Sequence, residues 1–334
     1  MKRDDLLQEV AVEQAVGLML AHDLTQIIPG EFKGRLFRKG HVIREDDIPA
    51  LLSIGKEHIY TMRLKDGILH EDEAARRMAE AVRSPEVTLT DPHEGKITLK
   101  SAIHGLAVID KARIDAMNAL DGIVMSTIRS HTPVKPGQPL IGTRVVPLVI
   151  EEERVAAVER IAASSEEPIL QVRPFRPLRA GLITTGSEVF KGRIEDKFGP
   201  VVREKLAAFG SEVIEQRFAP DDSAVIIREI HRFLHEDKAE IILLTGGMSV
   251  DPDDRTPGAI KGAGADIVSY GTPMLPGSML LMGYIQGVPI MGLPGCVMHD
   301  PFTSFDVLLP RILAGEIIER AHITELGYGG LLGC

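Results

Sequence analysis

Cysteine is scarce in this chain of 334 residues, because only Cys296 and Cys334 are present. Two cysteines are too few for a disulfide framework or for a zinc site built from thiolates. Basic blocks are missing too, and the formal net charge is −10. A protein that binds DNA or RNA needs a basic surface that displaces the counterions of the phosphates. Since Lys and Arg are interleaved with Asp and Glu here, the composition argues against nucleic acid as a partner.

Long apolar segments are also absent. No apolar run approaches the length of a helix that crosses a bilayer, and the opening MKRDDLLQEV lacks the apolar segment of a signal peptide. We therefore expect a cytoplasmic protein without membrane contact. The hydrophobic fraction of 44% and the charged fraction of 26% are those of an ordinary globular protein. The length predicts more than one domain.

Residues 1–65 predict a small α+β unit. In EDDIPALLSIG, acidic residues precede an apolar face formed by Ile48, Leu51 and Leu52, which is typical of a helix, and Gly55 can end it. The HIYTM that follows is typical of a short strand.

Residues 66–150 predict a β-rich domain that begins with a short helix at 70–82. Its strand-like segments are separated by Gly and Pro turns such as Lys135-Pro136-Gly137. Residues 151–175 predict a connecting region, in which EEERVAAVERIAA forms an exposed helix and SSEEP a linker.

Residues 176–320 predict an α/β domain. RAGLITTG and AEIILLTGG are apolar strands that run into glycine, and amphipathic helix patterns lie between the strands. This alternation predicts right-handed crossovers and a parallel sheet covered on both faces, a three-layer αβα fold. MLLMGYIQGVPIMGL predicts a hairpin that turns at Gln286-Gly287, and a last helix should end near Ala314. The Gly-rich end, 321–334, predicts a flexible tail.

Two glycine-containing loops follow the apolar strands, at 184–188 (TTGSE) and 245–250 (TGGMSV). Ligands of parallel sheets bind at the carboxyl ends of the strands. Glycine lets the backbone approach an anion, and Ser and Thr hydroxyls add donors. No Gly-Lys-Ser/Thr is present, so a nucleotide-hydrolysing P-loop is not predicted. Taken alone, either loop is better explained as a plain turn.

Acidic residues gather around these loops. We interpret Asp222, Asp251 and Asp253 as helix caps or solvated turn residues. A carboxylate beside a phosphate repels it unless a divalent cation bridges the two, and Mg²⁺ typically combines one or two carboxylates with phosphate oxygens. Loops and acids together predict a site for a phosphoester and Mg²⁺.

Six motifs give this region a specific resemblance. TGSEV, GRIED, FAPDD, TGGMSVDPDD, PMLPG and GLPG occur in this order, and in order and spacing they resemble the molybdopterin-binding domain family. The late loops are most similar to the molybdopterin molybdenumtransferase branch, which includes the C-terminal region of gephyrin. The resemblance implies Mg²⁺ held by Asp196, Asp221 and Asp254, with Asp221 and Asp254 as catalytic residues. The residues that it implies for the molybdopterin phosphate are Thr185, Gly186, Ser187, Glu188, Gly246, Gly247, Ser249, Pro276, Gly277, Pro294 and Gly295.

The N-terminal region is more divergent. AVGLMLAHDLT, at 15–25, resembles the opening helix of the transferase family. The family's Asp-Gly-Tyr-Ala stretch, which contributes an acid across the dimer, is not found. Cys296 follows Leu-Pro-Gly where the family has Asn, and Ser187 stands where many transferases have Asp. These departures concern catalysis more than pterin binding.

The resemblance implies a function in molybdenum cofactor biosynthesis. Such a transferase binds adenylated molybdopterin, inserts molybdate and releases AMP, and by analogy the chain forms a homo-oligomer, a dimer. Its partners would be small molecules, the pterin and molybdate. Two alternatives stay open. Asp253-Asp254-Arg255-Thr256 resembles a loop of CinA-type magnesium-dependent dinucleotide pyrophosphatases, whereas the missing upstream acid favours a non-catalytic molybdopterin carrier or sensor.

Overall fold

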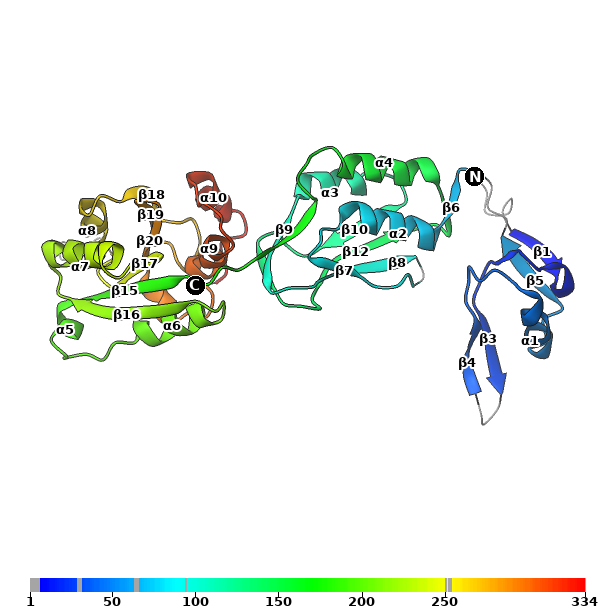
Figure 1. The fold of residues 1–334 in the computed structure, drawn as a ribbon, viewed down its shortest axis with the longest axis horizontal. Coiled ribbons are helices and arrows are strands. Elements are labelled where there is room, and N and C mark those ends of the chain that lie inside the picture. Colours follow the sequence, from blue (N-terminus) through cyan, green and yellow to red (C-terminus); the bar gives the residue numbers. More distant parts are fainter. Residues whose placement is uncertain are drawn as a thin grey trace.

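The computed structural model describes residues 7–28, 32–62, 66–93, 95–249, 251 and 254–333. An N-terminal unit, a middle domain and a C-terminal domain follow one another along the long axis (Figure 1). No helix in these ranges is long and apolar enough to span a membrane.

The N-terminal unit contains an antiparallel sheet in the order β1-β5-β2 and a separate hairpin of β3 and β4. The helix and the strand that we expected at its end are confirmed as α1 and β5. The opening helix expected at 15–25 is wrong, because Gly17 has a φ of +82° that interrupts a helix. Strands form there instead. The elements are β1 (Leu7–Ala11), η2 (Val12–Gln14), β2 (Met19–Leu20), β3 (Leu24–Ile28), β4 (Phe32–Phe37), η3 (Glu45–Asp47), α1 (Ile48–Ser53) and β5 (His58–Met62).

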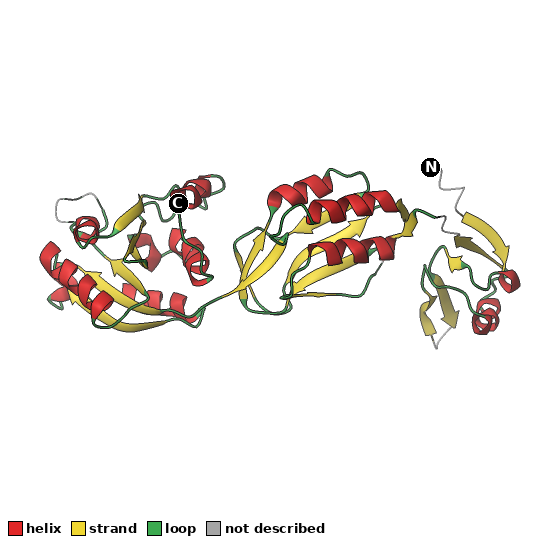
Figure 2. Cartoon of the chain, turned by 45° about the horizontal axis from the view of Figure 1, so that its top comes forward, coloured by secondary structure: helices red, strands yellow, loops and turns green. Residues whose placement is uncertain are grey.

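The middle domain combines strands with three helices (Figure 2). Its sheets have the orders β10-β12-β8-β7, β11-β9-β14 and β13-β6. Helix α2 packs against β8 and β12, over one continuous apolar core. The elements are β6 (Ile68–His70), α2 (Glu71–Val82), β7 (Val87–Leu89), β8 (Lys96–Ser101), β9 (Gly105–Ile109), α3 (Lys111–Asn118), β10 (Ile123–Thr127), β11 (Thr132–Val134), β12 (Pro139–Val145), β13 (Val149–Glu151), α4 (Glu152–Ala162) and β14 (Leu170–Pro174).

Helix α4 is not the exposed connecting helix that we expected at 151–163. Val155 and Val158 are fully buried in the core of the middle domain. After α4, strand β14 pairs antiparallel to β9, so the chain leaves this domain only beyond Pro174. The apolar stripe of α4 is narrow and five of its eleven residues are charged, which is why the sequence suggested a solvated helix.

The C-terminal domain is built on a six-stranded sheet in the order β16-β15-β17-β20-β19-β18. The first four strands are parallel, β19 is antiparallel to both of its neighbours, and β18 therefore runs in the same direction as the first four. Helices α6 and α9 bury one core and α7 and α8 the other, so the three-layer αβα fold is confirmed. The elements are β15 (Arg179–Thr185), α5 (Ser187–Phe190), α6 (Phe198–Ala207), β16 (Glu212–Ala219), α7 (Ser223–His235), β17 (Ile241–Thr245), α8 (Thr256–Gly262), β18 (Asp266–Tyr270), β19 (Leu281–Ile285), β20 (Val288–Leu293), η4 (Gly295–Met298), α9 (Ser304–Leu313), α10 (Arg320–Thr324) and η5 (Glu325–Gly327).

The expected hairpin connects β19 and β20. Gln286 and Gly287 turn it with φ values of +51° and +82°, the backbone that a two-residue type I′ turn requires. This hairpin lies inside the sheet rather than at its edge, since β20 pairs with β17 and β19 pairs with β18.

The end of the chain packs on the C-terminal domain and is not a loose tail in its described part. Ile323 is fully buried. The Leu275 N–H donates to the Gly330 carbonyl at 2.8 Å, and the Leu332 N–H donates to the Leu275 carbonyl at 2.9 Å. Backbone hydrogen bonds need no particular side chain, so a glycine-rich segment can pair with another segment. The glycine content alone therefore suggested flexibility where the structure has backbone pairing. Cys334 lies outside the described residues.

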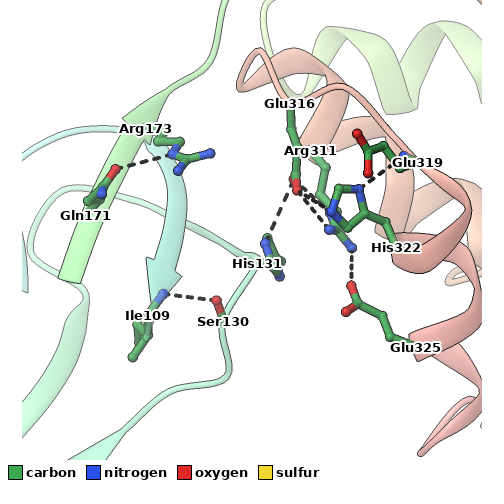
Figure 3. A network of polar contacts seen from close by, with 10 residues as sticks. All are labelled: Ile109, Ser130, His131, Gln171, Arg173, Arg311, Glu316, Glu319, His322 and Glu325. Atoms are coloured by element: carbon green, nitrogen blue, oxygen red, sulfur yellow. Dashed lines mark hydrogen bonds and ion pairs between the residues drawn. The ribbon is translucent and has the colours of Figure 1, made fainter. Parts of the chain in front are cut away.

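The middle and C-terminal domains meet at a polar cluster (Figure 3). Arg311, only 1% exposed, donates from Nε and Nη2 to Glu316 at 2.8 Å each and from Nη1 to Glu325 at 2.9 Å. His131 of the middle domain brings Nε2 to 3.9 Å from the same Glu316 carboxylate. Burial and the Arg311 charge lower the pKa of His131, although Glu316 and Glu325 act in the opposite direction.

Candidate functional site

A cavity of about 640 Å³ lies beyond the carboxyl ends of β17 and β20. It is bounded by the loops that follow these two strands and by the loop that precedes β19. Three loops that are distant in sequence therefore converge on one space. The predicted site residues that line it are Gly246, Gly247, Ser249, Asp254, Pro276, Gly277, Pro294 and Gly295.

The lining of this cavity is apolar and acidic. Phe198, Leu275 and Met279 contribute apolar side chains. Asp251, Asp254 and Asp300 contribute carboxylates. No Lys, Arg or His side chain is among the described lining residues, so an anionic group bound here depends on backbone N–H donors and on the hydroxyls of Ser249 and Ser278.

Buried threonine hydroxyls connect the two glycine loops. The Thr185 hydroxyl donates to the Thr245 carbonyl at 3.2 Å and lies 3.0 Å from the hydroxyl of Thr256. The Thr256 hydroxyl in turn donates to the Gly246 carbonyl at 2.9 Å. All three threonines are at most 4% exposed. They hold the loops in position and do not present their hydroxyls to a ligand.

The glycines of the site differ in the space that surrounds them. A Cβ at Gly246 would lie 2.3 Å from the Thr185 carbonyl oxygen, and a Cβ at Gly277 would lie 2.3 Å from Ser304 Oγ. These two glycines are required by the packing of the protein itself. A Cβ at Gly295, by contrast, would meet nothing within 4 Å.

The first glycine loop does not line the cavity. The predicted residues Thr185, Gly186, Ser187 and Glu188 are absent from the described lining. Instead, the Ser187 N–H donates to the Asp221 carboxylate at 2.8 Å. Asp221 therefore positions this loop, whose strand β15 lies beside β17.

The three carboxylates predicted to hold Mg²⁺ do not come together. The Asp196 carboxylate accepts the N–H groups of Phe198 and Gly199 at 3.0 Å each and the Gln216 amide at 2.5 Å. Asp221 accepts from Ser187, as described above. Only Asp254 of the three lines the cavity. Within the described ranges, no three His, Cys, Asp or Glu residues are placed to hold a metal ion, so the residues do not fit Mg²⁺ as this set.

Several residues of the site lie outside the set of predicted site residues. Tyr270, at the end of β18, donates its hydroxyl to the Met248 carbonyl at 3.0 Å and fixes the second loop. Burial, reinforced by the charge of Asp254, raises the pKa of this hydroxyl, which stays a donor. Asp251, which we interpreted as a turn residue, and Asp300 both line the cavity. Asp300 lies close in sequence to the GLPG loop, and this position could have indicated that it belongs to the site. By contrast, no sequence feature near Tyr270 indicated its contact across the sheet edge.

Comparisons with known proteins agree with this location. A family model described as "Probable molybdopterin binding domain" matches residues 181–314, and a "Domain of unknown function (DUF8806)" matches residues 9–63. A molybdopterin molybdenumtransferase of Staphylococcus aureus is 26% identical over 177 residues, 50% of this chain and 41% of that protein. A CinA-like protein of Mycobacterium tuberculosis is 35% identical over 78 residues, 23% of this chain and 18% of that protein. The chain thus spans less than half the length of these curated relatives.

Solved structures of molybdopterin biosynthesis proteins are also similar. The enzyme MoaB of Thermus thermophilus is 23% identical with a TM-score of 0.34, over 42% of this chain and 98% of that chain. The moea protein of Pyrococcus horikoshii is 15% identical with a TM-score of 0.34, over 92% of this chain and 75% of that chain. By its match to the family model and by its motif loops, the segment 181–314 belongs to the molybdopterin-binding domain family.

Proposed function

We propose that this chain acts in molybdenum cofactor biosynthesis and binds a phosphorylated pterin of the molybdopterin type in the cavity of its C-terminal domain. One observation carries the proposal: three motif loops, far apart in sequence, line a single cavity. The match of residues 181–314 to the molybdopterin-binding family supports the class of ligand.

The lining suits the two ends of such a ligand in different ways. A pterin is a flat ring with N–H donors on one edge, and a carboxylate such as Asp254 or Asp300 accepts these donors in charge-assisted hydrogen bonds. Phe198 and Met279 offer apolar surface for the ring. The phosphate has no basic side chain to meet among the described lining residues, so it is assigned to backbone N–H groups of the glycine loops.

Within this proposal the chain transfers molybdate to adenylated molybdopterin with release of AMP. The chain's own residues bind and orient: the glycine loops position the phosphate, Asp254 contacts the ligand, and Asp221 holds the neighbouring loop through Ser187. Asp196 and Asp221 do not provide a Mg²⁺ site in this cavity, because both already accept backbone N–H groups and neither is among its described lining residues.

Two rival functions have specific support. A CinA-type dinucleotide pyrophosphatase is favoured by the 35% identity over 78 residues. However, Thr256 of its resembling loop is fully buried and bonded to Gly246, which suits a positioning residue better than a catalytic one. A carrier or sensor is favoured because the predicted carboxylates do not gather in the described structure.

The test is AMP release from adenylated molybdopterin by the full chain, with and without molybdate, and with other dinucleotides as competing substrates. Release that depends on molybdate and yields active cofactor is the expected result. AMP from other dinucleotides without molybdate would support the pyrophosphatase, and binding without turnover would support the carrier. A chain that bound no pterin at all would overturn the proposed ligand class.

Asp254→Asn tests the contact between this carboxylate and the ligand. A hydrogen bond to a charged group is worth about 1.5–3 kcal/mol, so affinity for the pterin should fall by roughly tenfold or more. Asp266→Asn, an exposed position on β18 that does not line the cavity, is the matched control. Equal affinities in the two variants would remove Asp254 from the contact.

A further inference from the structure

A second cavity, of about 320 Å³, lies between the N-terminal unit and the middle domain. The N-terminal unit contributes Arg35 and Arg38, near the β3–β4 hairpin, together with Lys39. The middle domain contributes Glu71 at the start of α2 and Arg144 on β12. Two parts of the chain therefore complete this space.

Among the described residues that line this cavity, cationic side chains outnumber carboxylates, although the whole chain has a net charge of −10. Two of its cations are held by acids: Arg35 Nη1 lies 2.8 Å from Asp23, and Lys39 Nζ lies 2.6 Å from Glu71. The remaining carboxylate, Asp72, accepts the Gly95 N–H at 2.9 Å. The cationic residues in the lining are Arg35, Arg38, Lys39 and Arg144, and the acidic ones are Asp23, Glu71 and Asp72.

Arg38 and Arg144 are the uncompensated charges of this group. In the part of the chain that the structure describes, neither guanidinium has a hydrogen bond or an ion pair. Arg144 is partly buried, so its charge has lost some water without gaining a partner among the described residues. An anion placed between the arginines would supply that partner. The planar fork of a guanidinium matches two oxygens of a tetrahedral oxyanion.

We propose that this second cavity binds a tetrahedral oxyanion, either free or as the phosphoryl group of a small molecule, through Arg38 and Arg144. Lys39 adds positive charge while Glu71, which is 4% exposed, fixes its position. The site is separate from the pterin cavity, whose described lining holds no basic side chain. It joins the N-terminal unit to the middle domain through the bound anion.

The test titrates the full chain at low ionic strength with inorganic phosphate, with molybdate and with glycerol phosphate, by calorimetry. Binding of the inorganic ions identifies a free oxyanion as ligand, whereas binding of glycerol phosphate alone identifies a phosphoryl group. Arg38→Gln and Arg144→Gln should each weaken binding by about tenfold or more. Added salt should weaken it as well. Failure of all three probes to bind at millimolar concentration would refute the site, as would binding that neither variant changes.

Arg76→Gln is the matched control, because Arg76 is exposed on α2 and does not line this cavity. It removes the same charge from the same domain and should leave binding unchanged. Thermal melting without ligand separates binding from folding. Arg144→Gln should melt at the same temperature as the wild type or higher, since it removes an unpaired charge. A large loss of stability would show that Arg144 serves the fold and would overturn its assignment to the anion.

Discussion

A methyl group added at Gly295 would test the pterin cavity without disturbing the fold. Gly295 lines the cavity, begins η4 and is outside the left-handed backbone region. Its added Cβ would meet no protein atom within 4 Å. Gly295→Ala should therefore fold like the wild type, and the methyl group should occupy space that the ligand needs.

The expected effect on binding follows from the usual cost of overfilling a packed site. That cost is about 1–3 kcal/mol, which corresponds to an affinity loss of about 5- to 150-fold. Calorimetry with adenylated molybdopterin measures the affinity, and urea unfolding measures the stability. The free energy of unfolding should stay equal or rise by up to about 1 kcal/mol, because alanine restricts the unfolded chain.

Two further glycines provide the controls. Gly258→Ala in α8 also adds a methyl group in open space, but Gly258 does not line the cavity. It should gain stability without losing affinity. Gly277→Ala should lose stability, because its Cβ would lie 2.3 Å from Ser304 Oγ and its φ is +120°. If Gly295→Ala bound the pterin as tightly as Gly258→Ala does, the ligand would not fill this cavity.

Two other predictions concern buried polar groups. Thr256→Val should lower the free energy of unfolding by about 1–3 kcal/mol, because it leaves the Gly246 carbonyl and the Thr185 hydroxyl without this partner. Urea titration measures this loss. The control variant Thr324→Val, at an exposed position, should lower the free energy of unfolding far less. The pKa of His131 is lowered from 6.5 by burial, so below that pH the unfolded chain takes up a proton that the folded chain does not, and stability falls. His131→Asn, which tolerates the φ of +60°, should reduce the drop in melting temperature between about pH 7.5 and pH 5.5; an unchanged drop would contradict this assignment.

The sequence was most informative where a pattern repeats along the backbone. Apolar strands that run into glycine predicted β15 and β17, and Gln286-Gly287 predicted the hairpin. These predictions succeeded because the spacing of apolar residues and the backbone φ of a turn residue depend on the local sequence. Pattern reasoning failed at α4, whose two buried valines are too few to distinguish a packed helix from a solvated one. At 15–25 the helix was implied by the family resemblance, and the structure does not contain it because Gly17 is in the left-handed region.

The candidate site was predictable as a group of loops but not as a set of contacts. Parallel strands end at one edge, so the loops after β17 and β20 could be expected to lie together. The sequence did not indicate which acidic residues remain available to a ligand. Asp196 and Asp221 accept backbone N–H groups, whereas Asp300 faces the cavity, and such pairings depend on the three-dimensional course of each loop.

The threonine network explains how the first glycine loop contributes without lining the cavity. Thr184 and Thr245 are register partners on adjacent strands, and the hydroxyl of Thr185 crosses from the first loop to the second. Because Gly246 has no side chain, Thr185 can lie against its backbone, and Thr256 can bond to its carbonyl. A change in the first loop would therefore reach the ligand through the backbone of Gly246 and Gly247. The TTG of β15 is then a support for the TGG of β17, and of these two loops only the second lines the proposed binding cavity in the described structure.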